Sequence, residues 1–349
     1  MGSPWYATRE SIKSTLDVAE TARNNAQVDR AIEAASRAAE GYLHRVFYPE
    51  VKTRYFDWPN LQFARSWRLW LSQNELISVS SIASGGTAIP ATDFYLEPNE
   101  YGPPYDRIEI DLDSSSAFSS NGTHQRSIAV TGLWGYADDE TTVGLTVEAL
   151  DSSETGVDVD GPTAAMVGVG SVLRIDGERM LVTERGTLTT GQTLQSALTD
   201  MDNVVAVAVS SGSAFAVGEV ILLDSERMLI TDIAGNSLTV IRAWDGSVLA
   251  EHSGSTIYAY RTLTVVRGAL GTTAASHNSG ATVRRWDPPA LLSALVVADA
   301  INLLEQGAGG YARTTGARDN ELPSTGRGLK DVRELARAEL GRQARKAAA

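Results

Sequence analysis

The sequence predicts an α+β fold in which an all-β domain is inserted between two helical ends of the chain. Helical patterns of apolar residues lie near both ends of the 349 residues. The stretch 138–285 is instead rich in Val, Thr, Gly and Ser, alternates in polarity and has almost no helical pattern. We therefore expect a core domain made of 1–137 and 286–349, with an inserted β domain at 138–285.

The first two helices are indicated by their apolar spacing. Thr8 can cap a short helix, and a second helix of about five turns follows Asn25. In the second, apolar and alanine residues recur every three or four positions from Val28 to Leu43, with charged residues between them. Short strands are then expected at Thr53–Trp58, Trp67–Leu71, Leu76–Ile82, Phe94–Leu96, Arg107–Leu112 and Ser127–Thr131.

This strand region is dense in aromatic side chains, which are suited either to packing or to stacking on nucleic-acid bases. They are Tyr55, Phe56, Trp58, Phe63, Trp67 and Trp70. Because few basic residues are interleaved with them in the sequence, we interpret them as core and subunit-interface residues.

Asp287–Gly307 has the marks of one buried helix. Asp287 can cap its start, and the two prolines that follow fit a first turn. Leucine, valine and isoleucine cover nearly its whole circumference, so we expect it to be covered on all sides. The helix at Ala26–His44 is its expected partner. A Gly/Thr-rich loop at 307–328 and a charged helix at 329–346 complete the chain.

The inserted domain contains two internal repeats. The segments 167–184 and 215–232 share 9 of 18 residues at an offset of 48, and each is typical of a β-hairpin. The segments 236–257 and 262–283 share a second pattern, LTV-x-R followed by Gly, His and Gly. One module is therefore continuous at 215–257, whereas the other is split. We predict two nested β modules, the second inserted into the first.

The alignment makes two pairs of residues equivalent. Arg242 corresponds to Arg267, and His252 corresponds to His277. A residue present in both copies is expected to serve the fold of the module rather than a unique active site.

Charge is unevenly spread along the chain. Residues 138–260 hold 19 acidic and 5 basic residues, a net charge of −14, whereas the whole chain carries −13. Phosphates are repelled by such a segment, which argues against a nucleic-acid grip there. We interpret it as a solvated surface, with an acidic recognition patch as the alternative.

The composition bears on compartment and modification. The chain has no cysteine, so no disulfide or thiolate metal site is expected. Its first residues lack the apolar stretch of a secretion signal, which predicts synthesis and use in a cytoplasm. The sequon at Asn121 is then a chance match.

Motifs of catalysis are missing from the sequence. There is no phosphate-binding G-x-x-x-x-G-K-[ST] loop, no G-x-S-x-G turn and no H-E-x-x-H helix. His44 and His124 are isolated in the sequence, and the other two histidines are repeat residues. Asp158–Gly161 resembles the start of a calcium loop but lacks the later ligands. Some pair of carboxylates in a cleft stays open, but we expect no enzyme, no metal and no cofactor.

Six segments, in order, resemble the head–tail connector (head-to-tail adaptor) proteins of long-tailed double-stranded DNA phages. They hold 81 residues, all outside 138–285: ATRESIKSTLDV, AQVDRAIEAASRAAEGYLHRVFYPE, TRYFDWP, ATDFYLEP, SIAVTGLWGY and PPALLSALVVADAINLLEQ. The large insertion departs from the compact pattern of that family, so its role is not carried over. Its repeat is similar to small β modules of phage structural proteins.

The resemblance implies a helical-bundle core with a small β-sheet and a non-enzymatic virion protein. It implies a ring, expected to be a dodecamer, that docks under the portal protein and seals the head–tail junction. DNA would pass through its lumen without sequence-specific binding, and a neck or tail-terminator protein would bind on the tail side. No membrane is involved. The segment 307–349 would engage the portal, with Tyr311, Arg313 and Arg318 as contact candidates.

A second function class stays open. A phage baseplate or fibre-type protein could use the β modules to bind host carbohydrate. Aromatic residues of the insertion would then form the binding surface, and Trp244, Tyr258 and Tyr260 are the candidates.

Overall fold

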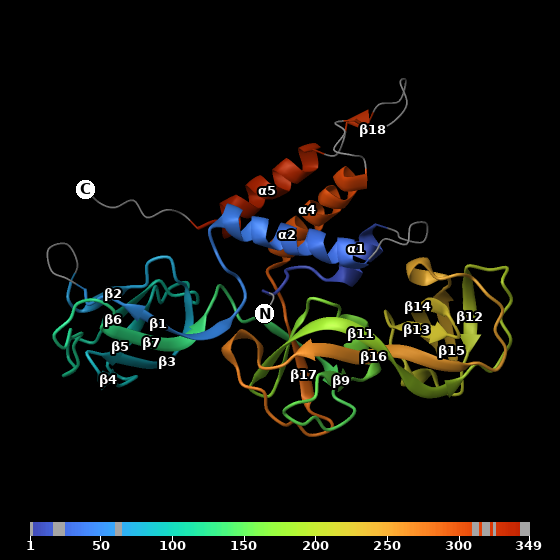
Figure 1. Ribbon diagram of the computed structural model, residues 1–349, viewed down its shortest axis with the longest axis horizontal. Helices are drawn as coiled ribbons and strands as arrows, with labels where there is room; N and C mark the ends of the chain where they lie inside the picture. The colour runs from blue at the N-terminus through green and yellow to red at the C-terminus, as the bar shows by residue number, and fades with distance from the viewer. Residues whose placement is uncertain are drawn as a thin grey trace. The chain divides into compact units, whose positions relative to one another are not determined.

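The computed structural model describes residues 3–16, 25–59, 65–308, 314–315, 322–323 and 326–342. Its α-helices are α1 (Arg9–Thr15), α2 (Asn25–Leu43), α3 (Gly161–Met166), α4 (Ala290–Ala308) and α5 (Gly326–Leu340) (Figure 1). Three short 3₁₀ turns are η1 (Gly212–Ala214), η2 (Trp244–Gly246) and η3 (Ala269–Gly271).

The strands of the first half are β1 (Glu50–Phe56), β2 (Arg68–Trp70), β3 (Leu76–Ser84), β4 (Thr87–Ile89), β5 (Phe94–Glu97), β6 (Arg107–Ile110), β7 (Ile128–Trp134), β8 (Glu140–Leu145) and β9 (Gly156–Asp158). Those of the second half are β10 (Val172–Ile175), β11 (Glu178–Thr193), β12 (Val204–Ala208), β13 (Val220–Leu223), β14 (Glu226–Ala234), β15 (Ser237–Ile241), β16 (Thr256–Val266), β17 (Thr282–Trp286), β18 (Thr314–Thr315) and β19 (Leu322–Pro323).

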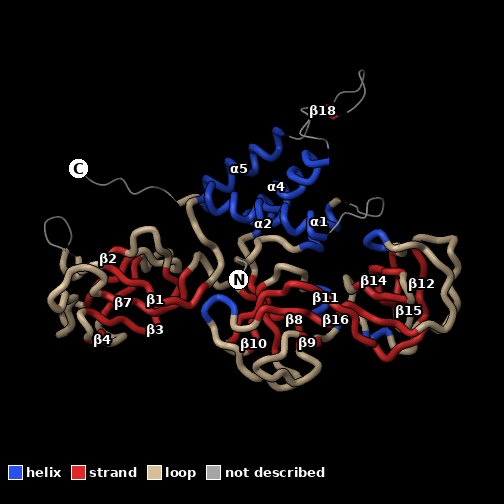
Figure 2. The backbone as a smooth tube through the Cα atoms, in the orientation of Figure 1, coloured by secondary structure: helices blue, strands red, loops and turns tan. Residues whose placement is uncertain are grey.

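The predicted α+β fold with a helical-bundle core is wrong. Strands hold 37% of the chain and helices 23%, and the described residues include only five α-helices (Figure 2). Three antiparallel sheets carry the fold: a four-stranded, a three-stranded and a ten-stranded one, besides the short pair β18–β19. The physical reason is that three hydrophobic clusters are built by strand residues, so the sheets bury apolar surface without a helical bundle.

Several predicted elements are nevertheless present. Thr8 caps α1 in a reciprocal capping box with Ser11, and α2 begins at Asn25 as expected. The apolar segment after Asp287 forms α4, and the C-terminal charged segment forms α5. All six predicted strands of the first half exist, with shifted ends.

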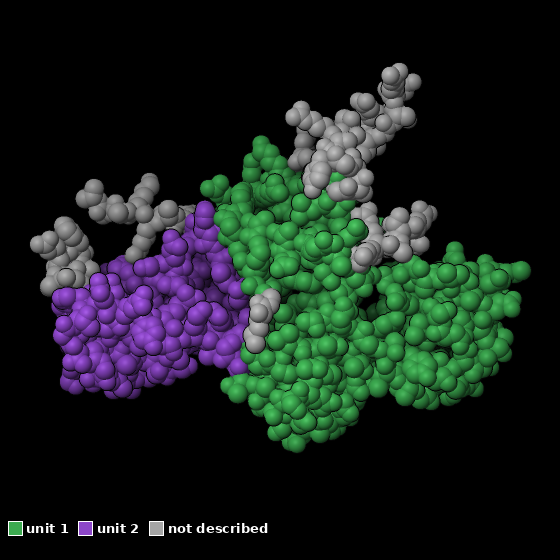
Figure 3. Space-filling view, viewed as in Figure 1, with its two compact units in different colours: residues 1–42, 140–269, 273–341 green, residues 43–139, 270–272, 342–349 purple. Residues whose placement is uncertain are grey.

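The chain divides into two compact units (Figure 3). One comprises 1–42, 140–269 and 273–341, and the other comprises 43–139, 270–272 and 342–349. The bounds of these units differ from those of the predicted core and insertion. That the core and the insertion fold independently stays a prediction.

The smaller unit holds two antiparallel sheets, ordered β1-β7-β3-β4 and β2-β6-β5. Phe56, Trp58 and Trp67 pack in or against its hydrophobic cluster, and Phe63 lies outside the described residues. The structure also shows what the sequence pattern missed, because arginines are interleaved with the aromatic rings. Arg68 lies over the rings of both Trp67 and Trp70, at 4.8 and 5.6 Å from their centroids.

In the larger unit, α1, α2, α4 and α5 gather on one side of the ten-stranded sheet (Figure 1), and we call them the helical layer. Ser293 of α4 donates a hydrogen bond to the carbonyl oxygen of Tyr6, and Arg333 of α5 pairs with Asp299 of α4 at 2.8 Å. Burial raises the pKa of Asp299 against the opposing charge of Arg333. One chain does not cover α4 on all sides, since Leu303 is 40% exposed.

The ten-stranded sheet contains the two nested modules that the repeat predicted. The hairpin β10–β11 pairs with β16 and β17, so 167–184 and 262–283 share one sheet. The first module buries one apolar cluster, from Val143 to Val283, and the second buries another, from Leu194 to Ala259. The chain enters the second module along β11 and returns along β16, and these two strands pair side by side with three irregularities.

Candidate functional site

The repeat residues Arg242 and His252 meet at a buried carboxylate in the second module. Glu226 accepts hydrogen bonds from Arg242 Nε at 3.0 Å and Nη2 at 2.7 Å, and from two backbone N–H groups. His252 Nε2 lies 2.9 Å from the same carboxylate, and its Nδ1 lies 2.7 Å from Asp224. The side chains of Glu226 and Arg242 are both 0% exposed, so the charges compensate each other away from water.

The first module repeats this cluster with its own residues. Glu178 accepts two hydrogen bonds of 2.8 Å from Arg267 and two from backbone N–H groups. His277 Nε2 lies 2.9 Å from Glu178, and its Nδ1 lies 2.8 Å from Asp176. We call these two sets of residues the ionic clusters.

The ionic clusters bind their own charges rather than a ligand. Burial by itself would raise the pKa of Glu178, but hydrogen bonds from Arg267, Ala275 N–H and His277 outweigh it and lower the pKa to about 2. The pKa of Glu226 is lowered in the same way. Both ring nitrogens of each histidine face carboxylates, which leaves neither nitrogen for a substrate or a metal. This arrangement suits the role in the fold that was predicted for the four repeat residues.

Sequence reasoning missed the glutamates at the centre of these clusters. Glu178 and Glu226 stand in both hairpins within the shared Glu-Arg-Met-Leu run, so the signal was present. An arginine and a histidine that are buried in both copies require a buried counter-charge. The glutamate that is repeated in the same alignment was the residue that could have been predicted to supply it.

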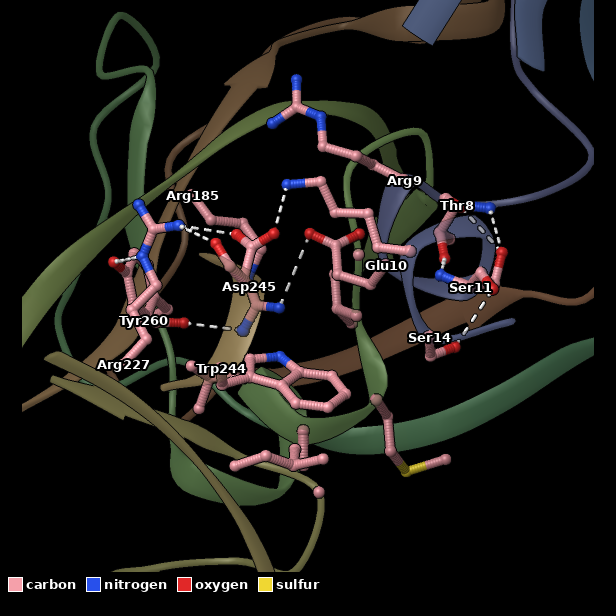
Figure 4. Close-up of a pocket in the computed structure, with 18 of the residues that line it drawn as sticks. Thr8, Arg9, Glu10, Ser11, Ser14, Arg185, Arg227, Trp244, Asp245 and Tyr260 are labelled. Atoms are coloured by element: carbon pink, nitrogen blue, oxygen red, sulfur yellow. Dashed lines mark hydrogen bonds and ion pairs between the residues drawn. The ribbon is translucent and has the colours of Figure 1, made fainter. Parts of the chain in front are cut away.

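A cavity of about 350 Å³ lies between α1 and the second module (Figure 4). The helix α1, the segment 165–168, the middle of β11 and the second module all contribute to its wall. Its main charged and aromatic lining residues are Glu10, Lys13, Arg185, Arg227, Trp244 and Asp245. Cavities with aromatic walls and a few polar groups are typical of binding sites.

The charges around this cavity are paired with one another. Asp245 lies 2.6 Å from Lys13 of α1 and 2.6 Å from Arg227 of β14. Arg227 Nε also donates to the hydroxyl oxygen of Tyr260 at 2.8 Å. Burial raises the pKa of Glu10, opposed by the nearby charge of Arg185. The cavity therefore has no concentrated charge of one sign, which favours a ligand that offers an apolar surface and backbone-like polar groups.

The aromatic candidates of the insertion are brought together only in part. Trp244 and Tyr260 line this cavity. Tyr258 is 40% exposed and is not among its lining residues.

The other predicted contacts cannot be placed on a surface. Tyr311, Arg313 and Arg318 lie outside the described residues. Across the described ranges, no cluster of His, Asp or Glu is arranged to hold a metal ion. No helix in the described part of the chain is long and apolar enough to cross a membrane.

Comparison with known proteins places no relative beside this chain: no family model, no curated protein and no solved structure matches it.

Proposed function

We propose that this chain is a virion structural protein that forms a ring, expected to be a dodecamer, between the portal and the tail of a long-tailed phage. The ring would seal the head–tail junction and let DNA pass through its lumen. The proposal retains the order and spacing of the connector-like segments. It does not need the helical-bundle core, which the fold excludes.

The observation that carries the proposal is the incompletely covered apolar helix α4. Leu291, Val297 and Ile301 are only half-buried, and Leu303 is exposed. On α5, Leu335 is exposed as well, at 49%. Apolar side chains left exposed or only half-buried on adjoining helices indicate a candidate contact surface for another protein chain. A head-to-tail contact between unlike surfaces of identical subunits produces a closed ring when the rotation closes.

The ionic clusters and the acidic insertion also support a structural role. The buried arginines of the clusters are neutralised by their own glutamates, so they offer no charge to phosphates. Outside 138–260 the chain holds 24 acidic and 25 basic residues, and this near-neutral balance suits a lumen through which DNA slides without being bound. The acidic insertion would project outward, toward tail or neck proteins.

Electron micrographs of the purified protein, alone and with portal protein, test the proposal. We expect closed rings with a channel wide enough for duplex DNA. Leu303→Glu should abolish the rings, whereas Val248→Glu, at a valine that is 78% exposed in the second module, should leave them intact. Monomers at all concentrations, with and without portal, would contradict the proposal.

One observation favours the carbohydrate-binding alternative. Trp244 and Tyr260 line the same cavity, and aromatic faces beside polar groups suit sugar rings. Glycan-array binding that is lost in Trp244→Ala, in a protein that forms no ring, would support a baseplate or fibre-type protein instead.

A further inference from the structure

The two modules share a short turn that precedes their first hairpin strand. Gly168-Val169-Gly170 in the first module corresponds to Ala216-Val217-Gly218 in the second. In both turns the final glycine donates its N–H to a carbonyl oxygen on the second strand of the hairpin, at 2.9 Å to Val182 in the first module and 2.8 Å to Ile230 in the second. In both, the first residue donates its N–H to a side chain three positions on, at 3.2 Å. The two turns are therefore equivalent in backbone geometry as well as in sequence.

In the first module, this turn is covered by the N-terminal segment of the chain. The carbonyl oxygen of Val169 accepts a hydrogen bond of 3.1 Å from the N–H of Arg9, and its own N–H donates to Glu10 at 2.8 Å. The ring of Trp5 lies against Gly170, where an added Cβ would be only 2.5 Å from the ring. Val169 is consequently 1% exposed.

In the second module, the same turn is open. Val217 is 55% exposed. Within the described part of the chain, no hydrogen bond is recorded for either of its backbone groups. A Cβ added to Gly218 would meet no atom closer than 3.7 Å, at Ala165. Gly218 and Tyr260 line the cavity of about 350 Å³, just as their equivalents Gly170 and Trp286 line the pocket beside Trp5.

We propose that this open turn of the second module, with the adjoining cavity, binds a segment of a different protein that enters a short helix and carries a tryptophan or tyrosine four residues before the first helical residue. The aromatic side chain would occupy the cavity over Gly218, as Trp5 does over Gly170. A backbone N–H four residues later and an acidic side chain five residues later would bind the two backbone groups of Val217. This spacing is copied from Trp5, Arg9 and Glu10 on the first module.

The chain's own N-terminal segment does not supply this occupant, because it already lies on the first module. The N-terminal segment of a second copy does not supply it either, since that segment covers its own first module. The walls of the cavity also distinguish the two sites. Trp244 and Asp245 of the second module stand where the first module has Ala269 and Leu270, so the open site adds an indole and an already paired carboxylate to the wall beside the aromatic slot.

The test uses a synthetic peptide of residues 3–16 as a probe of this chemistry, added to the full-length protein. Fluorescence anisotropy of the labelled peptide should show saturable binding of one peptide per chain. A Trp5→Ala peptide should bind about tenfold more weakly or worse, because it loses the buried ring. In the protein, Val217→Pro removes the N–H donor and should weaken binding similarly. The matched control is Val204→Asp, at an exposed valine of the same module. A proline is not used at this position because Val204 lies inside a strand.

A photo-crosslinking residue at position 5 of the peptide locates the site. Crosslinks to 217–220 or Tyr260 support the proposal. Crosslinks confined to 169–172 or Trp286 would show exchange at the first module and overturn it, as would the lack of saturable binding up to about 1 mM. Circular dichroism checks that the Val217→Pro protein is folded. If it is not, Val217→Asp provides the second variant, and unchanged peptide affinity in that variant also overturns the proposal. None of these readouts depends on ring formation.

Discussion

The two β modules have the same interior and different outer faces. Both bury a glutamate under an arginine and a histidine, with bond lengths that agree closely. Outside, the first module carries the N-terminal segment of the helical layer, whereas the second presents an open turn and a cavity. Repeated residues therefore specify the module, and residues that differ between the copies specify what each module contacts.

One pair of equivalent arginines illustrates the difference. Arg179 in the first module is nearly buried and lies 3.9 Å from Glu140 of β8. Its equivalent, Arg227, is more exposed and bonds to Asp245 and Tyr260 beside the cavity. The same residue is thus buried in one copy and lines the cavity in the other.

The largest expected effect comes from removing the charge of the glutamate at the centre of either ionic cluster. Glu226→Gln leaves Arg242 buried without its counter-charge, so we expect the second module to lose about 3–5 kcal/mol in its free energy of unfolding. Glu178→Gln should cost the first module a similar amount. Urea denaturation followed by circular dichroism and tryptophan fluorescence measures both. A loss below about 1 kcal/mol in either variant would show that the clusters do not hold the modules together.

Acid should affect the modules and the helical layer in opposite directions. The pKa of Glu178 falls from 4.5 to about 2 on folding, so its stabilisation is complete above pH 4.5 and is lost as the pH falls through 2. Burial raises the pKa of Glu40 in α2 and of Asp299 in α4, so their contribution is present at low pH and is lost as the pH rises. Hydrogen exchange between pH 5 and pH 2 should show the β modules opening before the helical layer. Earlier opening of the helices would contradict this assignment.

The next largest effect concerns stability, and it compares the covered turn of the first module with the open turn and cavity of the second. Trp5→Ala empties the slot over Gly170 and should destabilise the larger unit by about 2 kcal/mol, because a half-buried indole is lost. Trp244→Ala, at the rim of an already open cavity, should cost less than about 1 kcal/mol. Thermal unfolding of the two variants provides the comparison. Equal losses would mean that the two faces are packed alike.

The smallest effect concerns the charges beside the cavity. Asp245→Asn removes the ion pairs to Lys13 and Arg227, which are partly exposed, and should cost about 1 kcal/mol at low salt. The loss should shrink in high salt because the pairs are screened. Asp232→Asn, at an exposed position on β14, is the matched control and should change little. A loss that is independent of salt would point to packing rather than charge.

Local patterns in the sequence predicted individual elements well. The cap at Thr8, the apolar run of α4 and the repeated hairpins all depend on residues close together in the chain. The short helix α3 was missed, although Asp160 caps it and Pro162 fits its first turn, because the Val/Gly-rich surroundings favoured strands.

The fold class and the open site could not be predicted in the same way. Whether helices or strands organise a core depends on which surfaces meet, and the strands proved able to bury their own clusters. The cavity joins Lys13 to Asp245, which are 232 residues apart, so no spacing in the sequence indicates it. Likewise, the sequence does not indicate that Val169 is buried and Val217 exposed, because this depends on where the N-terminal segment lies.

The nested chain path has a mechanical consequence. The ends of the first module, at β8 and β17, are neighbouring antiparallel strands, whereas the second module is reached only through β11 and β16. Tension applied at residues 140 and 286 would therefore unzip β8 from β17 first and load the second module only after β11 has been pulled away from the first. The first module would therefore unfold before the second. The turn at Val217 would keep its shape while the first module unfolds.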